Sequence, residues 1–228
     1  MIYAIGDSFT EGAELPGHGG YRLPSPYAWP SVLAAKLNQD IINLGRSACG
    51  NTRIIKRTID VLYKDATGII ICWTSPGRIE MVDDVGIYDI WPARNPWWIT
   101  DNPDKQHRLE LLKYLTTHHS GDVNLLHDYK NFLRQVILIQ NLCQNNNVKC
   151  SMFIAFGARE NAVKFHDDPA VQNLLKCINL SIFVDNTLET STVEWTFNSP
   201  IMPGGHPGIE GQEIIADKVF KDILKKWF

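Results

Sequence analysis

The sequence predicts an α/β fold, a three-layer α/β/α sandwich around a central parallel sheet. Short apolar runs alternate along the chain with longer segments in which apolar residues recur at helical spacing. This alternation is typical of strand–helix–strand units with right-handed crossovers. Residues 69–73 are apolar without interruption, as expected of a central parallel strand that is covered on both faces. The chain has 228 residues, enough for one such domain but not comfortably for two, so we expect a single domain over residues 1–228.

The expected strands and helices follow one another in a regular order. Pro30 and Pro169 suit the first turns of two helices, and Asp168 is a suitable N-cap before Pro169. Asparagines 145–147 indicate the end of the longest helix. The predicted strands are residues 2–5, 41–44, 69–73, 150–156 and 182–184. The predicted helices are residues 30–38, 50–62, 122–146, 169–177 and 208–226.

Composition and charge exclude several classes of function. The net charge is −3 and no run of Lys or Arg is present, which argues against nucleic acid as a partner. No apolar run is long enough to span a membrane, and no signal peptide is seen, so we expect a cytoplasmic or virion-associated protein. The five cysteines are scattered and include no C-x-x-C pair, which favours free thiols over disulfides or a zinc site. We expect no metal and no cofactor; a homo-oligomer is compatible with the sequence.

A serine and a histidine stand at opposite ends of the chain in positions that suit catalysis. The first strand ends in Gly-Asp-Ser at residues 6–8, and ligands of α/β sheets bind beyond the carboxyl ends of strands. Taken alone, this tripeptide is more typical of an ordinary turn than of a catalytic loop. His206 lies in the Gly- and Pro-rich segment 203–208, directly before the last predicted helix. A sheet closed by its terminal elements could bring Ser8 and His206 together.

These motifs, with Asn43-Leu44-Gly45 between them, resemble the SGNH (GDSL) hydrolase family over nearly the whole chain, and the first motif is the cleanest match. The resemblance implies a flavodoxin-like α/β/α fold and ester hydrolysis, with Ser8 as nucleophile and His206 as general base. A serine hydroxyl needs such a base to attack at neutral pH. The resemblance further implies that the backbone N–H groups of Ser8 and Gly45 stabilise the oxyanion.

The third motif departs from the family pattern. The family has an asparagine that donates to the oxyanion, and Ser75 stands at that position here, so Ser75 is a further candidate oxyanion donor. Thr74, Asn51 or Arg78 could also take over this task. The variant Trp-Thr-Ser-Pro-x-Arg resembles versions found in phage-encoded members of the family. The predicted substrate-binding residues are Asp7, Asn51, Thr74, Arg78 and Trp97.

The acidic partner of the histidine also departs from the pattern. The family has an aspartate three residues before the histidine, and Pro203 stands there in this chain. Two prolines and two glycines shape the segment before His206, so we expect a backbone carbonyl of residues 201–204 to accept the Nδ1–H. The nearest acidic alternative is Glu210, which is expected to complement the helix dipole instead. We expect Asp7 to fix the serine loop.

Residues 78–121 interrupt the strand–helix alternation with a Trp-rich insertion of no clear period. One interpretation is an irregular segment that packs its aromatic side chains on its own domain. The other is a lid or substrate platform, because Trp rings stack on sugars and an insertion beside a cleft excludes water. On this second interpretation, at least one of Trp91, Trp97 and Trp98 faces the Ser8 cleft.

Two classes of function therefore remain open. The first, which we favour, is a serine esterase acting on a small-molecule or acylated carbohydrate ester through Ser8 and His206. The second is a non-catalytic binding or structural module on a degenerate SGNH scaffold. A metal hydrolase is a remote third, because His118 and His119 are adjacent and no His-Glu-x-x-His spacing is present.

Overall fold

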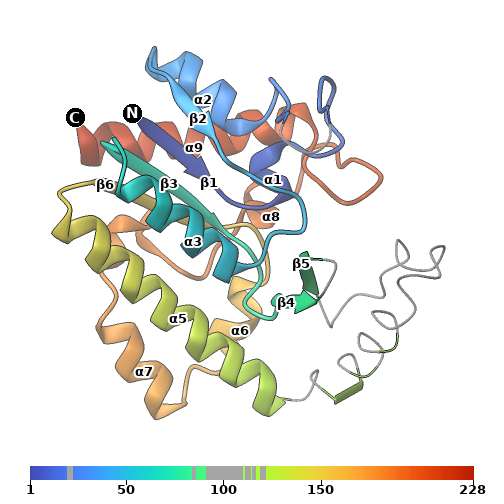
Figure 1. Cartoon of the computed structure of the whole chain (residues 1–228), viewed down its shortest axis with the longest axis vertical. Coiled ribbons are helices and arrows are strands. Elements are labelled where there is room, and N and C mark those ends of the chain that lie inside the picture. Colours follow the sequence, from blue (N-terminus) through green and yellow to red (C-terminus); the bar gives the residue numbers. More distant parts are fainter. Residues whose placement is uncertain (20–22, 84–85, 91–109, 111–113, 115–116, 119–121) are drawn as a thin grey trace.

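A sheet of four parallel strands, in the order β2-β1-β3-β6, forms the centre of the molecule (Figure 1). The structure, a computed structural model, describes residues 1–19, 23–83, 86–90, 110, 114, 117–118 and 122–228. The strands are β1 (Ile2–Ile5), β2 (Ile41–Asn43), β3 (Gly68–Trp73) and β6 (Lys149–Ile154). In the register of the sheet, Ile2 of β1 pairs with Ile41 and with Gly68. Four of the five predicted strands are thus confirmed.

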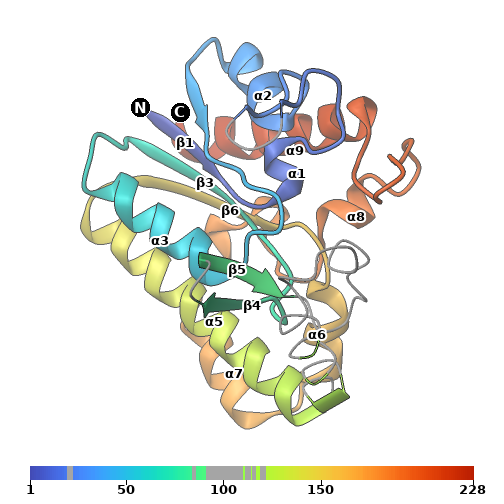
Figure 2. The same ribbon diagram turned by 45° about the vertical axis from the view of Figure 1, so that its right-hand side comes forward.

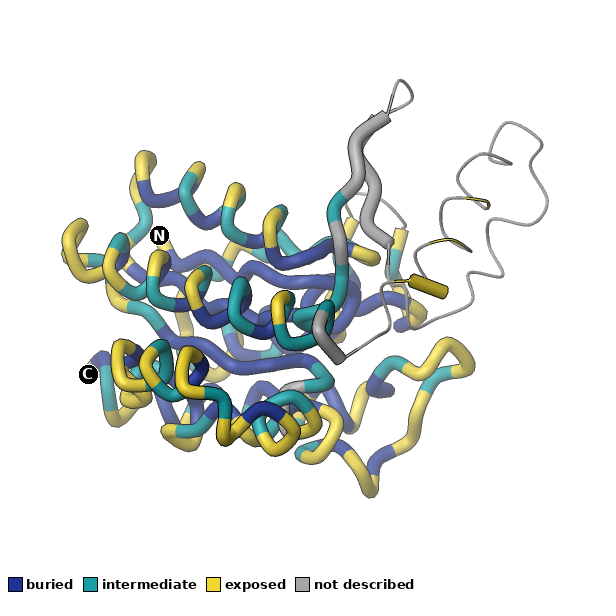
Figure 3. Tube along the Cα trace, turned by 90° about the horizontal axis from the view of Figure 1, so that it is seen from below, coloured by how far each residue is buried: buried dark blue, intermediate teal, exposed yellow. Residues whose placement is uncertain are grey.

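Helices cover both faces of this sheet, which confirms the three-layer α/β/α fold (Figures 1 and 2). The long helices are α2 (Trp29–Leu37), α3 (Asn51–Leu62), α5 (Asp122–Asn145) and α9 (Ile209–Trp227). Side chains alternate along β1: Tyr3 and Ile5 pack with α3 and α5, whereas Ile2 and Ala4 pack with α2 and α9. Figure 3 shows the strands buried between helices whose outer turns are exposed. Within the described parts of the chain, none of the helices has the length and apolar character needed to cross a membrane.

The predicted fifth strand at residues 182–184 is wrong. Two 3₁₀ turns, Leu180–Ile182 and Val184–Asn186, occupy this segment, and Phe183 between them makes a single parallel bridge to Met152. Asp185 has a φ of 59°, a left-handed conformation that cannot continue a strand. The shorter helices are α1 (Ser8–Glu11), α6 (Ala158–Lys164), α7 (Pro169–Lys176) and α8 (Thr192–Trp195).

The expected insertion at residues 78–121 begins with regular structure. Strands β4 (Ile79–Asp83) and β5 (Gly86–Ile90) pair as an antiparallel hairpin, which the sequence reading did not predict. Trp91, Trp97 and Trp98 lie outside the described residues. The expectation that they form a lid or platform therefore stays a prediction.

The strand order identifies where a ligand would bind. β2 and β3 flank β1 on opposite sides, so the connections that follow β1 and β2 lead to opposite edges of the sheet. Such a switch in direction opens a crevice beyond the carboxyl ends of the strands, where open α/β sheets bind ligands. Ser8 follows β1 at this edge, and Thr74 and Ser75 follow β3.

Candidate active site

The serine loop is built by a tight turn from β1 into the single helical turn α1. Asp7 is the N-cap, and its carboxylate accepts a 3.0 Å hydrogen bond from the backbone N–H of Phe9. Ser8 is the first residue of α1, so its own N–H has no acceptor within the helix. A side chain at Gly6 would lie only 2.2 Å from the Thr10 hydroxyl, so a glycine is needed here. The turn therefore leaves Ser8 with an unused backbone donor beside its hydroxyl.

Ser8 and His206 line the same pocket, a cavity of about 140 Å³. Two aromatic rings, Phe9 and Phe156, form part of its wall, and the ring of Phe9 lies edge-on to His206 with centroids 5.6 Å apart. Arg78, Val193, Gly204 and Gly205 complete the lining. The structure forms no hydrogen bond between the Ser8 hydroxyl and His206. Catalytic hydrogen bonds are often long or unformed before substrate binds, so the shared pocket is the relevant observation.

The Nδ1 atom of His206 lies 2.6 Å from a carboxylate oxygen of Glu14. The same carboxylate accepts from the backbone N–H of Gly204, at 2.9 and 3.0 Å for its two oxygens. A carboxylate at Nδ1 holds the proton on that nitrogen and leaves Nε2 unprotonated and able to accept a proton. Glu14 thus joins the N-terminal loop to the loop that carries His206.

Glu14 overturns the expectation that a backbone carbonyl of residues 201–204 accepts from His206. The Met202 carbonyl accepts from the N–H of Gly205 at 2.8 Å instead. Glu210 lies in the first turn of α9 and makes no contact with His206 among the hydrogen bonds of the described chain. The acidic partner is 192 residues away in sequence, which is why local spacing did not reveal it.

Asp7 is fully buried and connects the serine loop to the loop after β3. Its carboxylate accepts a 2.8 Å hydrogen bond from the Thr74 hydroxyl and forms an ion pair with Arg78 at 3.4 Å. Burial raises the pKa of Asp7 above its ordinary value, and Arg78, Thr74, the Phe9 N–H and His206 offset part of this rise. Asp7 therefore fixes the loop, as expected.

Asn51 and Thr74 are both engaged within the protein. The Asn51 amide accepts from the Thr74 N–H at 3.0 Å and donates to the carbonyls of Thr74 and Ser75. Ser75 is buried and is not part of the lining of the pocket. Arg78 does line it, held by a 3.0 Å hydrogen bond to the Cys49 carbonyl and by its position over the Phe156 ring. Of the four donors considered for the oxyanion, Arg78 alone lies with Ser8 and His206.

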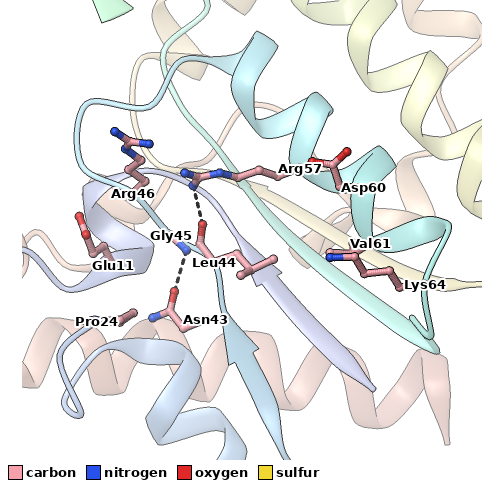
Figure 4. Close-up of a pocket in the computed structure, with 10 residues that line it drawn as sticks. All are labelled: Glu11, Pro24, Asn43, Leu44, Gly45, Arg46, Arg57, Asp60, Val61 and Lys64. Atoms are coloured by element: carbon pink, nitrogen blue, oxygen red, sulfur yellow. Dashed lines mark hydrogen bonds between the residues drawn. The ribbon is translucent and has the colours of Figure 1, made fainter. Parts of the chain in front are cut away.

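The structure does not bring Gly45 into this pocket. Its N–H donates a 2.8 Å hydrogen bond to the side chain of Asn43, and it lines a separate cavity (Figure 4). An added Cβ would lie 2.4 Å from the backbone nitrogen of Glu11, so a glycine is required here for close packing. The expected oxyanion role of Gly45 is not supported by this arrangement.

The described residues include no group of three or more His, Cys, Asp or Glu side chains placed to hold a metal ion. Trp97, the remaining predicted substrate-binding residue, lies outside the described parts of the structure. The site as described therefore consists of Ser8, Glu14 and His206, with Asp7 and Arg78 behind the serine.

Solved structures of several hydrolases share this fold. A lipase/acylhydrolase from Enterococcus faecalis matches with a TM-score of 0.51 and 11% identity, covering 97% of this chain and 94% of that one. A protein assigned to the lipolytic G-D-S-L family from Desulfitobacterium hafniense DCB-2 matches at 0.50 and 14%, covering 97% and 98%. A carbohydrate esterase family 2 enzyme with a carbohydrate-binding domain, from Corynascus thermopiles (Myceliophthora fergusii), matches at 0.51 and 14%, covering 99% of this chain and 65% of that one. At such identities these likenesses establish the fold.

Sequence comparison gives the family. A search of curated proteins finds no match to this chain. One family model, described as a family of unknown function (DUF6071), matches residues 11–227. The match covers almost the whole chain, including Glu14 and His206 but not the Gly-Asp-Ser segment at residues 6–8. The chain therefore belongs to DUF6071.

Proposed function

We propose that the chain is a serine esterase, a divergent member of the SGNH hydrolases, with Ser8 as nucleophile and His206 as general base. The observation that carries this proposal is the 2.6 Å contact of Glu14 with His206, which lines the same pocket as Ser8. A serine, a histidine and a carboxylate that orients the histidine form the arrangement that activates a hydroxyl for acyl transfer. The lipases and esterase that share the fold support the same conclusion.

The proposed reaction proceeds through an acyl-enzyme. Nε2 of His206 takes the proton of the Ser8 hydroxyl while Oγ attacks the carbonyl carbon of the ester. His206 then gives this proton to the leaving alkoxide, and the alcohol departs. Water, deprotonated by the same nitrogen, attacks the acyl-enzyme. His206 then returns this proton to Oγ of Ser8 as the bond to the acyl group breaks and the carboxylic acid leaves. Glu14 stabilises the imidazolium that forms in each half of the reaction.

The oxyanion of each tetrahedral intermediate needs fixed donors. The Ser8 N–H and the Arg78 guanidinium are the donors that this proposal assigns. The assignment rests on the free position of Ser8 at the start of α1 and on the place of Arg78 in the pocket lining. The pocket of about 140 Å³ is walled in part by the apolar side chains of Phe9, Phe156 and Val193, which suits a short acyl group on a small or carbohydrate alcohol.

Covalent labelling tests the proposal without knowledge of the substrate. Wild type, Ser8→Ala and Ser181→Ala proteins are treated with a fluorophosphonate, digested and mapped by mass spectrometry. We expect a stoichiometric adduct on Ser8 in wild type and in Ser181→Ala, whose altered serine is exposed and hydrogen-bonded to Asn179. We expect no adduct in Ser8→Ala. Folded wild-type protein that stays unlabelled, or labelling that persists in Ser8→Ala, would favour the binding-module alternative.

A further inference from the structure

A second cavity, larger than the serine pocket, is lined in part by Glu11 of α1. It measures about 380 Å³ and opens between the carboxyl end of β2, α1 and α3 (Figure 4). Its volume lies within the range of small-molecule sites in proteins. Ser8 and His206 are not among its lining residues, so it is separate from the proposed active site.

The floor of this cavity is rigid before any ligand binds. The Asn43 side chain accepts from the Gly45 N–H at 2.8 Å and donates to the Thr10 carbonyl at 2.7 Å. Packing of Gly45 against the backbone of α1 leaves no room for a Cβ. A floor fixed in this way loses little conformational entropy when a ligand binds.

Basic side chains outnumber acidic ones among the residues that line this cavity. Three basic side chains, Arg46, Arg57 and Lys64, line the cavity against two acidic ones, Glu11 and Asp60. Arg57 uses one guanidinium nitrogen to donate to the Leu44 carbonyl at 2.7 Å, which orients the group across the cavity (Figure 4). A guanidinium has five N–H donors, so donors remain for a ligand.

The two carboxylates differ in availability. Glu11 is buried and accepts hydrogen bonds from both the backbone N–H and the hydroxyl of Ser47. Asp60 is exposed, and Lys64 lies just beyond the C-terminal end of α3, next to Asp65, whose pKa it helps to lower. The three basic side chains outnumber the two carboxylates, so the net positive charge of the lining favours a negatively charged ligand.

We propose that this cavity binds a small organic anion, with its carboxylate or phosphate held by Arg57 and Lys64. Pro24, Leu44 and Val61 provide an apolar surface for the body of the ligand. Charge-assisted hydrogen bonds to a guanidinium give such a site its strength, and the ammonium of Lys64 adds a second positive charge. This proposal does not depend on the esterase function, because the two sites share no lining residue.

Three probes with the same ring separate the ligand classes: phenol, benzoate and phenyl phosphate. Each is titrated into wild-type protein by isothermal titration calorimetry at constant ionic strength and pH 7. We expect saturable binding with one-to-one stoichiometry for at least one of the two anions, about tenfold or more tighter than for phenol. The tighter of the two identifies the head group, carboxylate or phosphate.

Charge reversal at Lys64, just beyond the C-terminal end of α3, locates the binding. Lys64→Glu is expected to weaken the anion about tenfold, and Arg57→Gln to weaken it further. Lys56→Glu is the matched control, since Lys56 is exposed on α3, precedes Arg57 in the sequence and does not line the cavity. It is expected to change the dissociation constant less than twofold. Absence of saturable anion binding, equal affinity for phenol, or equal effects of Lys64→Glu and Lys56→Glu would overturn the proposal.

Discussion

The contact between Glu14 and His206 gives the sharpest prediction on mechanism. In Glu14→Gln the side-chain oxygen can still accept from the Gly204 N–H, but the new amide group cannot accept from Nδ1 of His206. The histidine then loses its orienting partner or adopts the tautomer that protonates Nε2, and Nε2 can no longer take the serine proton. Both outcomes slow acyl transfer.

The geometry sets the size of the effect. Loss of a buried triad carboxylate lowers kcat by about 10⁴-fold. Here the side chains of Glu14 and His206 are 32% and 20% exposed, so solvent screens the interaction. We therefore expect kcat to decrease by about 10²–10³-fold. Since each tenfold corresponds to about 1.4 kcal/mol, the activation barrier rises by about 3–4 kcal/mol. Stability should change by less than about 1 kcal/mol.

Two measurements check this prediction: hydrolysis of p-nitrophenyl acetate and the rate of inactivation by a fluorophosphonate. Both rates should fall together in Glu14→Gln, while KM changes little. Glu14→Asp keeps the charge and should recover part of the rate. Glu210→Gln is the control, because this glutamate lies in the first turn of α9 and not at His206. The reasoning fails if Glu14→Gln retains more than a third of the wild-type kcat, or if Glu210→Gln loses as much.

Two further predictions concern Arg78 and a pair of aspartates, Asp7 and Asp168, whose pKa values are shifted in opposite directions. Arg78→Lys should lower kcat about 10²-fold with little change in KM. A lysine ammonium cannot reach both Asp7 and the oxyanion in the way that the planar guanidinium does. An unchanged kcat would remove Arg78 from the mechanism. Acidification from pH 7 to about 4 should increase the stability of wild type relative to Asp7→Asn, because the pKa of Asp7 is raised by burial and protonation favours the native state. It should decrease the stability of wild type relative to Asp168→Asn, whose aspartate has a pKa lowered by the Val171 N–H and by Lys130. Urea unfolding at pH 4, 5, 6 and 7 measures both, and equal slopes for the two pairs would contradict the assignment.

The strands of the sheet could be predicted from the sequence because a short apolar run marks each of them. The continuous apolar runs of β1 and β3 are typical of strands that are covered on both faces, and both strands are fully buried. The prediction of a strand at residues 182–184 is wrong because Ile182 and Val184 belong to two successive 3₁₀ turns. The left-handed conformation of Asp185 cannot be inferred from a hydrophobic pattern. The β4–β5 hairpin was not predicted because the segment that contains it shows no clear periodicity.

The site could be predicted only in part, for a similar reason. Ser8 and His206 are adjacent to recognisable strand and helix boundaries, and the structure places both at one pocket. Glu14 lies in a loop with no periodicity, and the only available signal was an acidic residue close after the serine. The oxyanion role predicted for Gly45 lacks support because its N–H donates a hydrogen bond to the side chain of Asn43, two residues earlier. Such side-chain to main-chain bonds depend on loop conformation, which a single sequence does not specify.

The tie between Glu14 and the His206 loop has a consequence for biosynthesis. Ser8 and Glu14 are synthesised early, but the pocket wall includes Gly204, Gly205 and His206, and the backbone of Gly204 is bonded to Glu14. On the proposed mechanism, Ser8 lacks its general base until residue 206 has left the ribosome. If the proposed esterase mechanism holds, the growing polypeptide is inert towards esters throughout most of its translation and gains activity only in a late step.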